Sequence, residues 1–146
     1  EGWGLYSEWL GIEAGFYTDP YRDFGRLGYE AWRASRLVVD TGLHAFGWSR
    51  ERAIEYLAAN TTLPLHEVTT EIDRYISWPG QAPSYMIGNL AILRLRDAAQ
   101  EKLGAQFDLR AFHDQVLGRG SVTLPLLREL VEEWIATAPT LAPQIH

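Results

Sequence analysis

The stretch DPYRDFGRLGYEAWRASRLVVDTGLHAFG, residues 19–47, decides the fold class. Asp19 is a good helix cap and Pro20 favours the first helical turn, so together they mark a helix start. Apolar residues then recur at helical spacing until Gly47 supplies a stop signal. The pattern predicts one long amphipathic helix from Pro20 to about Phe46.

The same kinds of start and stop signal recur along the rest of the chain, and no run shows the sustained alternation of a strand. They predict further helices at about 2–16, 50–59, 62–78, 85–103 and 109–117, and a last one from Ser121 or Thr123 to about Ala136. We therefore expect an all-α fold, a compact domain of six or seven helices over residues 1–138. Pro139 and Pro143 make residues 139–146 an expected extended or disordered tail.

Composition narrows the class of protein. The chain has 146 residues, of which 47% are hydrophobic, which is enough for one buried core. No stretch approaches the roughly 18 apolar residues of a membrane span. A net charge of −6 argues against nucleic acid as a partner. The absence of cysteine excludes disulfides and thiol chemistry but leaves cytoplasm and periplasm open.

The opening segment, Glu1-Gly-Trp-Gly-Leu-Tyr-Ser-Glu8, combines two carboxylates with aromatic and glycine residues. In a helix, Glu1, Gly4, Glu8, Gly11 and Gly15 share one stripe. Each helical glycine costs about 1 kcal/mol relative to alanine, so the stripe predicts close approach of another backbone to the two acids. An inward-facing carboxylate needs a cation, a metal or a proton. The spacing fits equally well a structurally paired Glu8 and a frayed terminus at Glu1.

The chain also begins without methionine, directly in a helix with an apolar perimeter. We therefore expect it to be part of a larger protein.

One face of the long helix gathers polar residues that could form a site. They are Arg26, Glu30, Arg33, Arg36, Asp40 and His44. Asp40 and His44 are four residues apart, so the carboxylate could orient the imidazole. A solvated surface explains Arg26 and Glu30 better. Arg33, Asp40 and His44 lie in a more apolar run, which fits a buried structural network as well as a catalytic group.

The segment from Arg74 to Tyr85 places two tyrosines around a rigid Pro-Gly break. Tyrosine O–H groups can donate to a developing oxyanion, so Tyr75 and Tyr85 are candidates for a pocket edge. The alternative is that both are core aromatics with hydroxyls at the surface. His113 fits a structural histidine better than a metal ligand.

The chain contains no complete catalytic set. It has no H-E-x-x-H motif, no Gly-rich phosphate loop and no serine nucleophile elbow. A zinc site needs three protein ligands, and the four histidines are not spaced for one. We expect the chain alone to be inactive and to hold no cofactor.

Four ordered blocks nevertheless closely resemble the C-terminal part of a bacterial family called domain of unknown function 885. The blocks are Glu1–Glu8; Arg33–His44 continued by Gly47–Ile54; Trp78–Gly88; and Phe107–Leu117 continued by Gly120–Pro125. They span nearly the whole chain to Ile135. The resemblance implies a mostly helical, zinc-dependent metallopeptidase of the gluzincin type.

In that family an H-E-x-x-P-G-H-H segment precedes the region that this chain matches, and this sequence lacks it. The resemblance implies that Glu1 is the third zinc ligand and Glu8 a supporting acid near the metal. It implies that Tyr85 steadies the reaction intermediate. Arg74, Tyr75 and Gln81 then line the substrate cleft. Arg33, Asp40 and His44 fall in a matching block and His113 in another, without an assigned role.

The expected partners are the N-terminal half of the same protein, which would complete the zinc site, and a peptide substrate. The competing hypothesis is a non-catalytic helical domain that binds a partner through its acidic and arginine faces.

Overall fold

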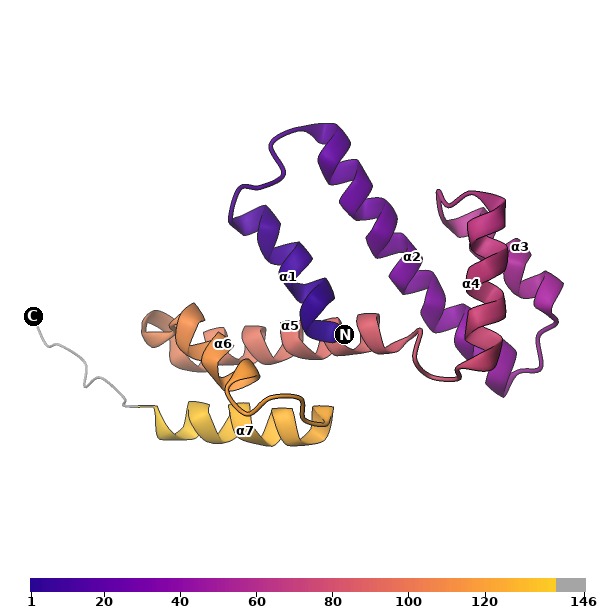
Figure 1. The fold of residues 1–146 in the computed structure, drawn as a ribbon. Helices are drawn as coiled ribbons and strands as arrows, with labels where there is room; N and C mark the ends of the chain where they lie inside the picture. Colours follow the sequence, from indigo (N-terminus) through magenta and orange to yellow (C-terminus); the bar gives the residue numbers. More distant parts are fainter. Residues whose placement is uncertain (139–146) are drawn as a thin grey trace, which may run out of the picture. The chain divides into compact units, whose positions relative to one another are not determined.

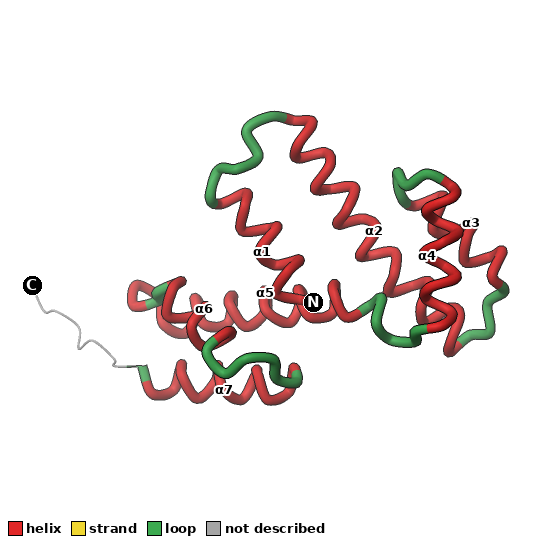
Figure 2. The backbone as a smooth tube through the Cα atoms, viewed as in Figure 1, coloured by secondary structure: helices red, strands yellow, loops and turns green. Residues whose placement is uncertain are grey.

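The computed structural model describes residues 1–138, which form seven α-helices and one short 3₁₀ helix (Figure 1). The helices are α1 (Gly2–Glu13), α2 (Pro20–Ala45), α3 (Arg50–Asn60), α4 (Leu65–Ser77), α5 (Ser84–Leu103), η1 (Gly104–Gln106), α6 (Leu109–Leu117) and α7 (Leu124–Thr137). No strand occurs within this part of the chain (Figure 2). The expected all-α fold of six or seven helices is confirmed. The expected tail, residues 139–146, lies outside the described residues.

Side-chain caps explain where several helices begin. The Asp19 carboxylate accepts hydrogen bonds from the backbone N–H groups of Tyr21 and Arg22 at the start of α2. Ser49 caps α3 and Asp108 caps α6 in the same way. These caps satisfy N–H groups that have no partner inside the helix, so the predicted starts of these helices are correct.

The first helix is shorter than predicted. It ends at Glu13 rather than Phe16, and Gly15 follows it with a φ of +74°. Only glycine adopts that backbone conformation without strain, so Gly15 serves a turn and not a helix face.

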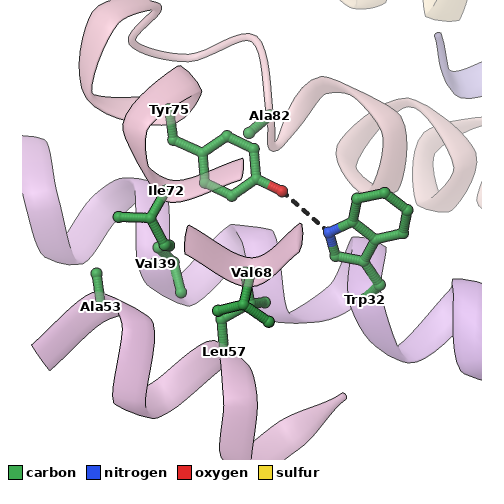
Figure 3. Close-up of a cluster of buried hydrophobic side chains, with 8 residues drawn as sticks. All are labelled: Trp32, Val39, Ala53, Leu57, Val68, Ile72, Tyr75 and Ala82. Carbon is green, nitrogen blue, oxygen red and sulfur yellow. Dashed lines mark hydrogen bonds between the residues drawn. The ribbon is translucent and has the colours of Figure 1, made fainter. Parts of the chain in front are cut away.

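The chain divides into two compact units, residues 1–89 and 90–146, and α5 contributes to both. In the first unit, α2, α3 and α4 enclose a core (Figure 3). Its buried side chains are Trp32, Val39, Ala53, Leu57, Val68, Ile72, Tyr75 and Ala82. Burying this apolar surface is the main stabilisation of the unit.

In the second unit, α6 packs on α7. Phe112 on α6 is fully buried, and its ring lies 6.4 Å from Trp134 of α7. Val116, Leu127 and Val131 are buried with it.

Close backbone approach occurs at Gly2 of α1 and Gly88 of α5, both in the first unit. A Cβ added at Gly88 would lie 2.7 Å from the Gly2 Cα, closer than real contacts allow. The predicted stripe makes no such backbone contact, because a Cβ at Gly4 would meet nothing within 4 Å and one at Gly11 would meet the ring of Tyr17 at 2.8 Å. The close approach of two backbones therefore occurs beside the predicted stripe, and Gly11 on the stripe makes room for a side chain.

Among the described residues, none of the helices combines the length and the apolar character that a membrane crossing requires.

Candidate functional site

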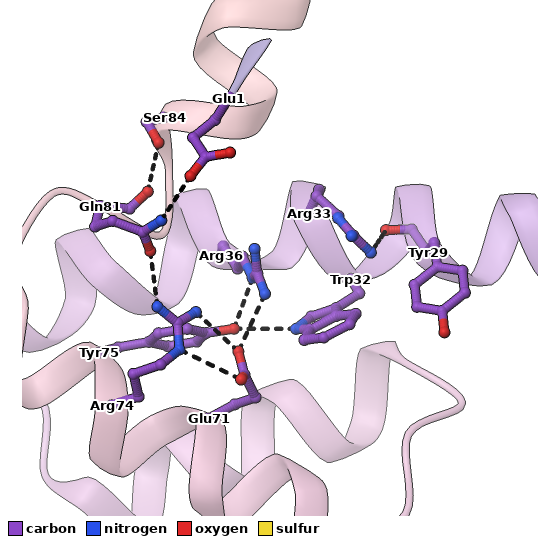
Figure 4. A network of polar contacts seen from close by, with 10 residues as sticks. All are labelled: Glu1, Tyr29, Trp32, Arg33, Arg36, Glu71, Arg74, Tyr75, Gln81 and Ser84. Atoms are coloured by element: carbon purple, nitrogen blue, oxygen red, sulfur yellow. Dashed lines mark hydrogen bonds and ion pairs between the residues drawn. The ribbon is translucent and has the colours of Figure 1, made fainter. Parts of the chain in front are cut away.

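A buried polar network in the first unit joins α2, α4 and the segment before α5 (Figure 4). Its centre is the hydroxyl of Tyr75, a residue with no exposed surface. That oxygen accepts hydrogen bonds from Trp32 Nε1 at 3.0 Å and from Arg36 Nε at 2.7 Å. The sequence placed Tyr75 on the wall of a substrate cleft, whereas the structure places it in the core. Its large apolar ring favours burial, and its hydroxyl finds partners there.

Glu71 supplies the negative charge of this network. Its carboxylate pairs with Arg36 Nη2 at 3.1 Å and with Arg74 Nη2 at 3.0 Å. Partial burial works to raise the pKa of Glu71, but hydrogen bonds from Arg74 and Tyr75 and the charges of Arg74 and Arg36 lower it overall. Burial, together with the hydrogen bond to Glu71, raises the pKa of Tyr75 to about 12. Tyr75 is therefore neutral and Glu71 is charged at neutral pH.

The network continues to the chain's first residue. Arg74 Nη1 donates to Gln81 Oε1 at 2.7 Å, and Gln81 Nε2 donates to Glu1 Oε1 at 3.2 Å. Figure 4 shows this series of contacts running from Glu71 through Arg74 and Gln81 to Glu1. Glu1 itself is exposed, so its carboxylate is both oriented and accessible.

Tyr85, on the first turn of α5, lies beside two arginines of α2. The guanidinium carbon of Arg36 is 5.1 Å from the centre of its ring, and that of Arg33 is 5.7 Å away. Tyr85 is partly exposed. The structure thus links Tyr85 to the same network as Glu1 through Arg36.

Asp40 and His44 hold the backbone that carries this network. The Asp40 carboxylate accepts from the N–H of Gly80 at 3.2 Å. His44 Nε2 lies 3.0 Å from the carbonyl oxygen of Tyr75, which can only accept, so Nε2 is the donor of this hydrogen bond. Each residue has its own backbone partner and therefore a structural role: His44 holds the last turn of α4 at Tyr75, and Asp40 holds the Pro-Gly break at Gly80.

Two other candidates lie apart from these contacts. Glu8 is partly exposed on α1, and its carboxylate has no ion pair or hydrogen bond within residues 1–138. It is therefore not the paired structural acid that one interpretation of the sequence favoured. His113 belongs to α6 of the second unit, where its ring lies 5.9 Å from that of Phe112.

Arg26 differs from the solvated residue that its sequence position suggested. Its side chain is only 9% exposed, pairs with Asp23 and Glu30, and lies over the ring of Tyr17. Its guanidinium is therefore held by two carboxylates and an aromatic ring, and is not a freely solvated charge.

Glu71 connects Arg36 and Arg74 but was not among the residues predicted from the sequence. The signal was available, because Glu71 and Arg74 are three residues apart and so adjacent on a helix surface. The link from Glu71 to Arg36 joins two helices that are distant in sequence, which spacing does not reveal.

The described residues contain no group of three or more histidine, aspartate or glutamate side chains that could hold a metal. Glu1 offers one accessible carboxylate whose orientation is set by Gln81. Metal-bound carboxylates are themselves usually hydrogen-bonded by neighbouring residues. Glu1 therefore fits one ligand of a zinc site, and not a whole site.

The chain is similar to a protein family and to a protein of known structure. A family profile described as "Bacterial protein of unknown function (DUF885)" matches residues 1–131. The chain is similar to a protein of known crystal structure, described as "the putative lipoprotein from Colwellia psychrerythraea". The two share 50% sequence identity and superpose with a TM-score of 0.90, and the match covers 93% of this chain. The match covers 23% of that protein's length. No curated protein matches the sequence.

Proposed function

This chain belongs to the DUF885 family of bacterial proteins, and we propose that it forms part of the active site of a zinc-dependent peptidase, with Glu1 as one metal ligand. The observation that carries the proposal is the set of contacts from Glu71 through Arg74 and Gln81 to Glu1. Three side chains in series set the orientation of this exposed carboxylate, as expected for a group that binds a metal.

The orientation of Glu1 matters because a metal ligand must hold its position before the metal binds. The Gln81 amide fixes one carboxylate oxygen, and Arg74 fixes the amide by occupying its oxygen. Residues of this supporting kind typically change metal affinity 10- to 100-fold when they are replaced. The acidic end of the series is Glu71, and despite its partial burial the neighbouring Arg74 lowers its pKa, which strengthens its preference for the charged form.

The remaining ligands and the general base belong to a preceding segment of the same protein, of the H-E-x-x-H type. The solved relative is long enough to contain such a segment, since the chain accounts for only 23% of its length. When bound, zinc would supply Lewis-acid chemistry to such a site, and Glu1 would be one of the residues that hold it.

This chain's own residues bind and orient the substrate. Tyr85 is partly exposed and stands beside two guanidinium groups, so its hydroxyl is available to donate to the oxygen of the peptide carbonyl as charge develops there. Arg74 and Gln81, which are hydrogen-bonded in series to Glu1, would line the substrate cleft in the complete protein. Tyr75 supports them from the core and does not touch the substrate.

The test uses the full-length protein that contains this chain. Zinc content and peptide hydrolysis, with and without a chelator, are measured for the parent, for Glu1→Gln and for Gln81→Met. We expect stoichiometric zinc and chelator-sensitive cleavage in the parent, loss of both in Glu1→Gln, and zinc affinity about 10- to 100-fold weaker in Gln81→Met. Glu55→Gln, at an exposed carboxylate of α3, serves as the control. Full zinc occupancy in Glu1→Gln would remove Glu1 from the metal site.

One observation favours a second candidate, a non-catalytic domain that binds a partner. Large apolar side chains are exposed around the connection between α1 and α2, including Phe16 at 72%, Tyr21 at 89% and Phe24 at 62%. Exposed apolar patches commonly mark interaction sites. A full-length protein that neither holds zinc nor cuts peptides would favour this candidate.

A further inference from the structure

We propose that Arg33 binds a carboxylate group of the substrate, so that the site acts on acidic peptides or near the free C-terminus of a chain. This inference deepens the proposed peptidase function and rests on it. It assigns a role to a residue that neither the fold nor the metal site explains.

Five of the seven arginines in the first unit are held in ion pairs with acids: Arg22 with Asp19, Arg26 with Asp23 and Glu30, Arg36 and Arg74 with Glu71, and Arg50 with Asp73. The other two are Arg33 and Arg52, and Arg52 is exposed to solvent. Arg33 has no carboxylate partner within residues 1–138, although it is only partly exposed.

The surroundings of Arg33 are aromatic. Its guanidinium carbon lies over the rings of Trp32 at 4.7 Å, Tyr29 at 4.9 Å and Tyr85 at 5.7 Å. Aromatic faces attract a cation, but they do not take its N–H groups as a carboxylate does. The rings therefore hold the guanidinium in place and leave its donors for another group.

The hydrogen bonds of Arg33 are correspondingly incomplete. Its Nη1 reaches only the carbonyl oxygen of Tyr29 at 3.5 Å, which is a long contact. Its Nε is buried and has no hydrogen-bond partner among the described residues. A partly desolvated cation with an unsatisfied donor is costly, and a carboxylate that accepts from the terminal Nη groups compensates the charge.

The position of Arg33 connects it to the proposed chemistry. It stands against Tyr85, whose hydroxyl we assign to the peptide carbonyl. A carboxylate bound at Arg33 therefore lies near the bond to be cut. That carboxylate has two chemical sources, the C-terminus of the peptide or an acidic side chain.

The test compares three N-acetylated peptides that differ in the presence and the position of a carboxylate. Trialanine with a free C-terminus, trialanine with a C-terminal amide, and Ala-Glu-Ala with a C-terminal amide are offered to the full-length protein. Variants are Arg33→Met, which keeps a long side chain against the aromatic rings, and Arg33→Lys, which keeps the charge but loses the planar fork. Arg52→Met is the matched control, because Arg52 stacks on Trp48 at 4.1 Å elsewhere in the same unit.

We expect the parent to prefer a carboxylate-bearing peptide over trialanine amide. Arg33→Met should raise KM for that peptide about 10- to 100-fold, the range of a charged hydrogen bond, and leave trialanine amide unchanged. Arg33→Lys should fall between, and Arg52→Met should match the parent. If the parent cleaves trialanine with a free C-terminus better, the carboxylate bound at Arg33 is the peptide's C-terminus. If it cleaves Ala-Glu-Ala amide better, the bound carboxylate is an acidic side chain. An unchanged preference in Arg33→Met, or an equal loss for the amide, overturns the proposal.

Equilibrium binding separates this proposal from the peptidase function. The same three peptides are titrated into each protein calorimetrically. If no peptide is cleaved but the carboxylate-bearing one binds in an Arg33-dependent way, the peptidase function fails and the carboxylate site stands. If peptides are cleaved but neither binding nor KM depends on Arg33, the carboxylate site fails alone.

Discussion

Removing a single oxygen atom from the core of the first unit should cost a large part of its stability. The change is Tyr75→Phe, which keeps the fully buried ring and deletes only the hydroxyl at the centre of the polar network. Because the ring stays, the substitution opens little space, and the cost comes from hydrogen bonds rather than from a cavity.

The magnitude follows from the donors left without an acceptor. Trp32 and Arg36 are 8% and 4% exposed, so water does not readily replace the lost oxygen. An unsatisfied neutral donor such as Trp32 Nε1 costs about 1 kcal/mol, and a charged donor such as Arg36 Nε about 2 kcal/mol. We expect Tyr75→Phe to lower the free energy of unfolding by about 3 kcal/mol, out of the roughly 5–15 kcal/mol of a typical domain.

Urea denaturation of the 146-residue chain, followed by circular dichroism, measures this difference. The denaturation midpoint should fall while the dependence on urea concentration stays constant, as for a pure change in stability. Tyr21→Phe is the control, because Tyr21 is 89% exposed and its hydroxyl removal should change stability by less than about 0.5 kcal/mol.

A double-mutant cycle with Trp32→Phe isolates one hydrogen bond. The two residues are in direct contact at 3.0 Å, so their effects should not add. We expect a coupling of about 1 kcal/mol. A loss below about 1 kcal/mol for Tyr75→Phe, or full additivity with Trp32→Phe, would show that the network is not what stabilises the core.

Three further predictions concern the same unit. Gly88→Ala should destabilise the chain by about 1–3 kcal/mol, since its Cβ meets the backbone of Gly2. Gly4→Ala should stabilise it by up to about 1 kcal/mol, because a Cβ there meets nothing within 4 Å and alanine favours a helix. Melting temperatures of the two variants test this contrast. Glu71→Gln should be less stable than the parent at pH 7. Because the folded-state pKa of Glu71 is lowered, this difference should shrink as the pH falls below about 4.5, which denaturation at several pH values measures. The pKa of Tyr75 is raised from 10 to about 12, so the parent should lose its advantage over Tyr75→Phe as the pH rises from 10 to 12, and an advantage that stays constant would contradict the assignment.

Local chemistry made the helices predictable. Caps such as Asp19, Ser49 and Asp108, and the stop at Gly47, act on the neighbouring residues alone, so a reader of the sequence can place them. The error at the end of α1 has the same explanation, because Gly15 was counted as part of a helix face when its positive φ makes it a turn residue.

The polar network was less predictable because its contacts join distant parts of the chain. Arg36 and Tyr75 are 39 positions apart, and Gln81 and Glu1 are 80 apart. Periodicity shows which side of a helix a residue occupies, but not which residue of another helix it meets. The sequence could therefore nominate Arg74, Tyr75 and Gln81 without revealing that Tyr75 lies in the core.

The burial of Tyr75 changes how the proposed site should be understood. A tyrosine at the surface could act on a substrate, whereas this one accepts from Arg36 and contributes, with Glu71, to the support of Arg74. Arg74 in turn fixes Gln81, the group that orients Glu1. Folding of the core and orientation of the Glu1 carboxylate are thus coupled through one set of hydrogen bonds. Variants at Tyr75 should consequently weaken zinc binding in the full-length protein even though Tyr75 touches neither metal nor substrate.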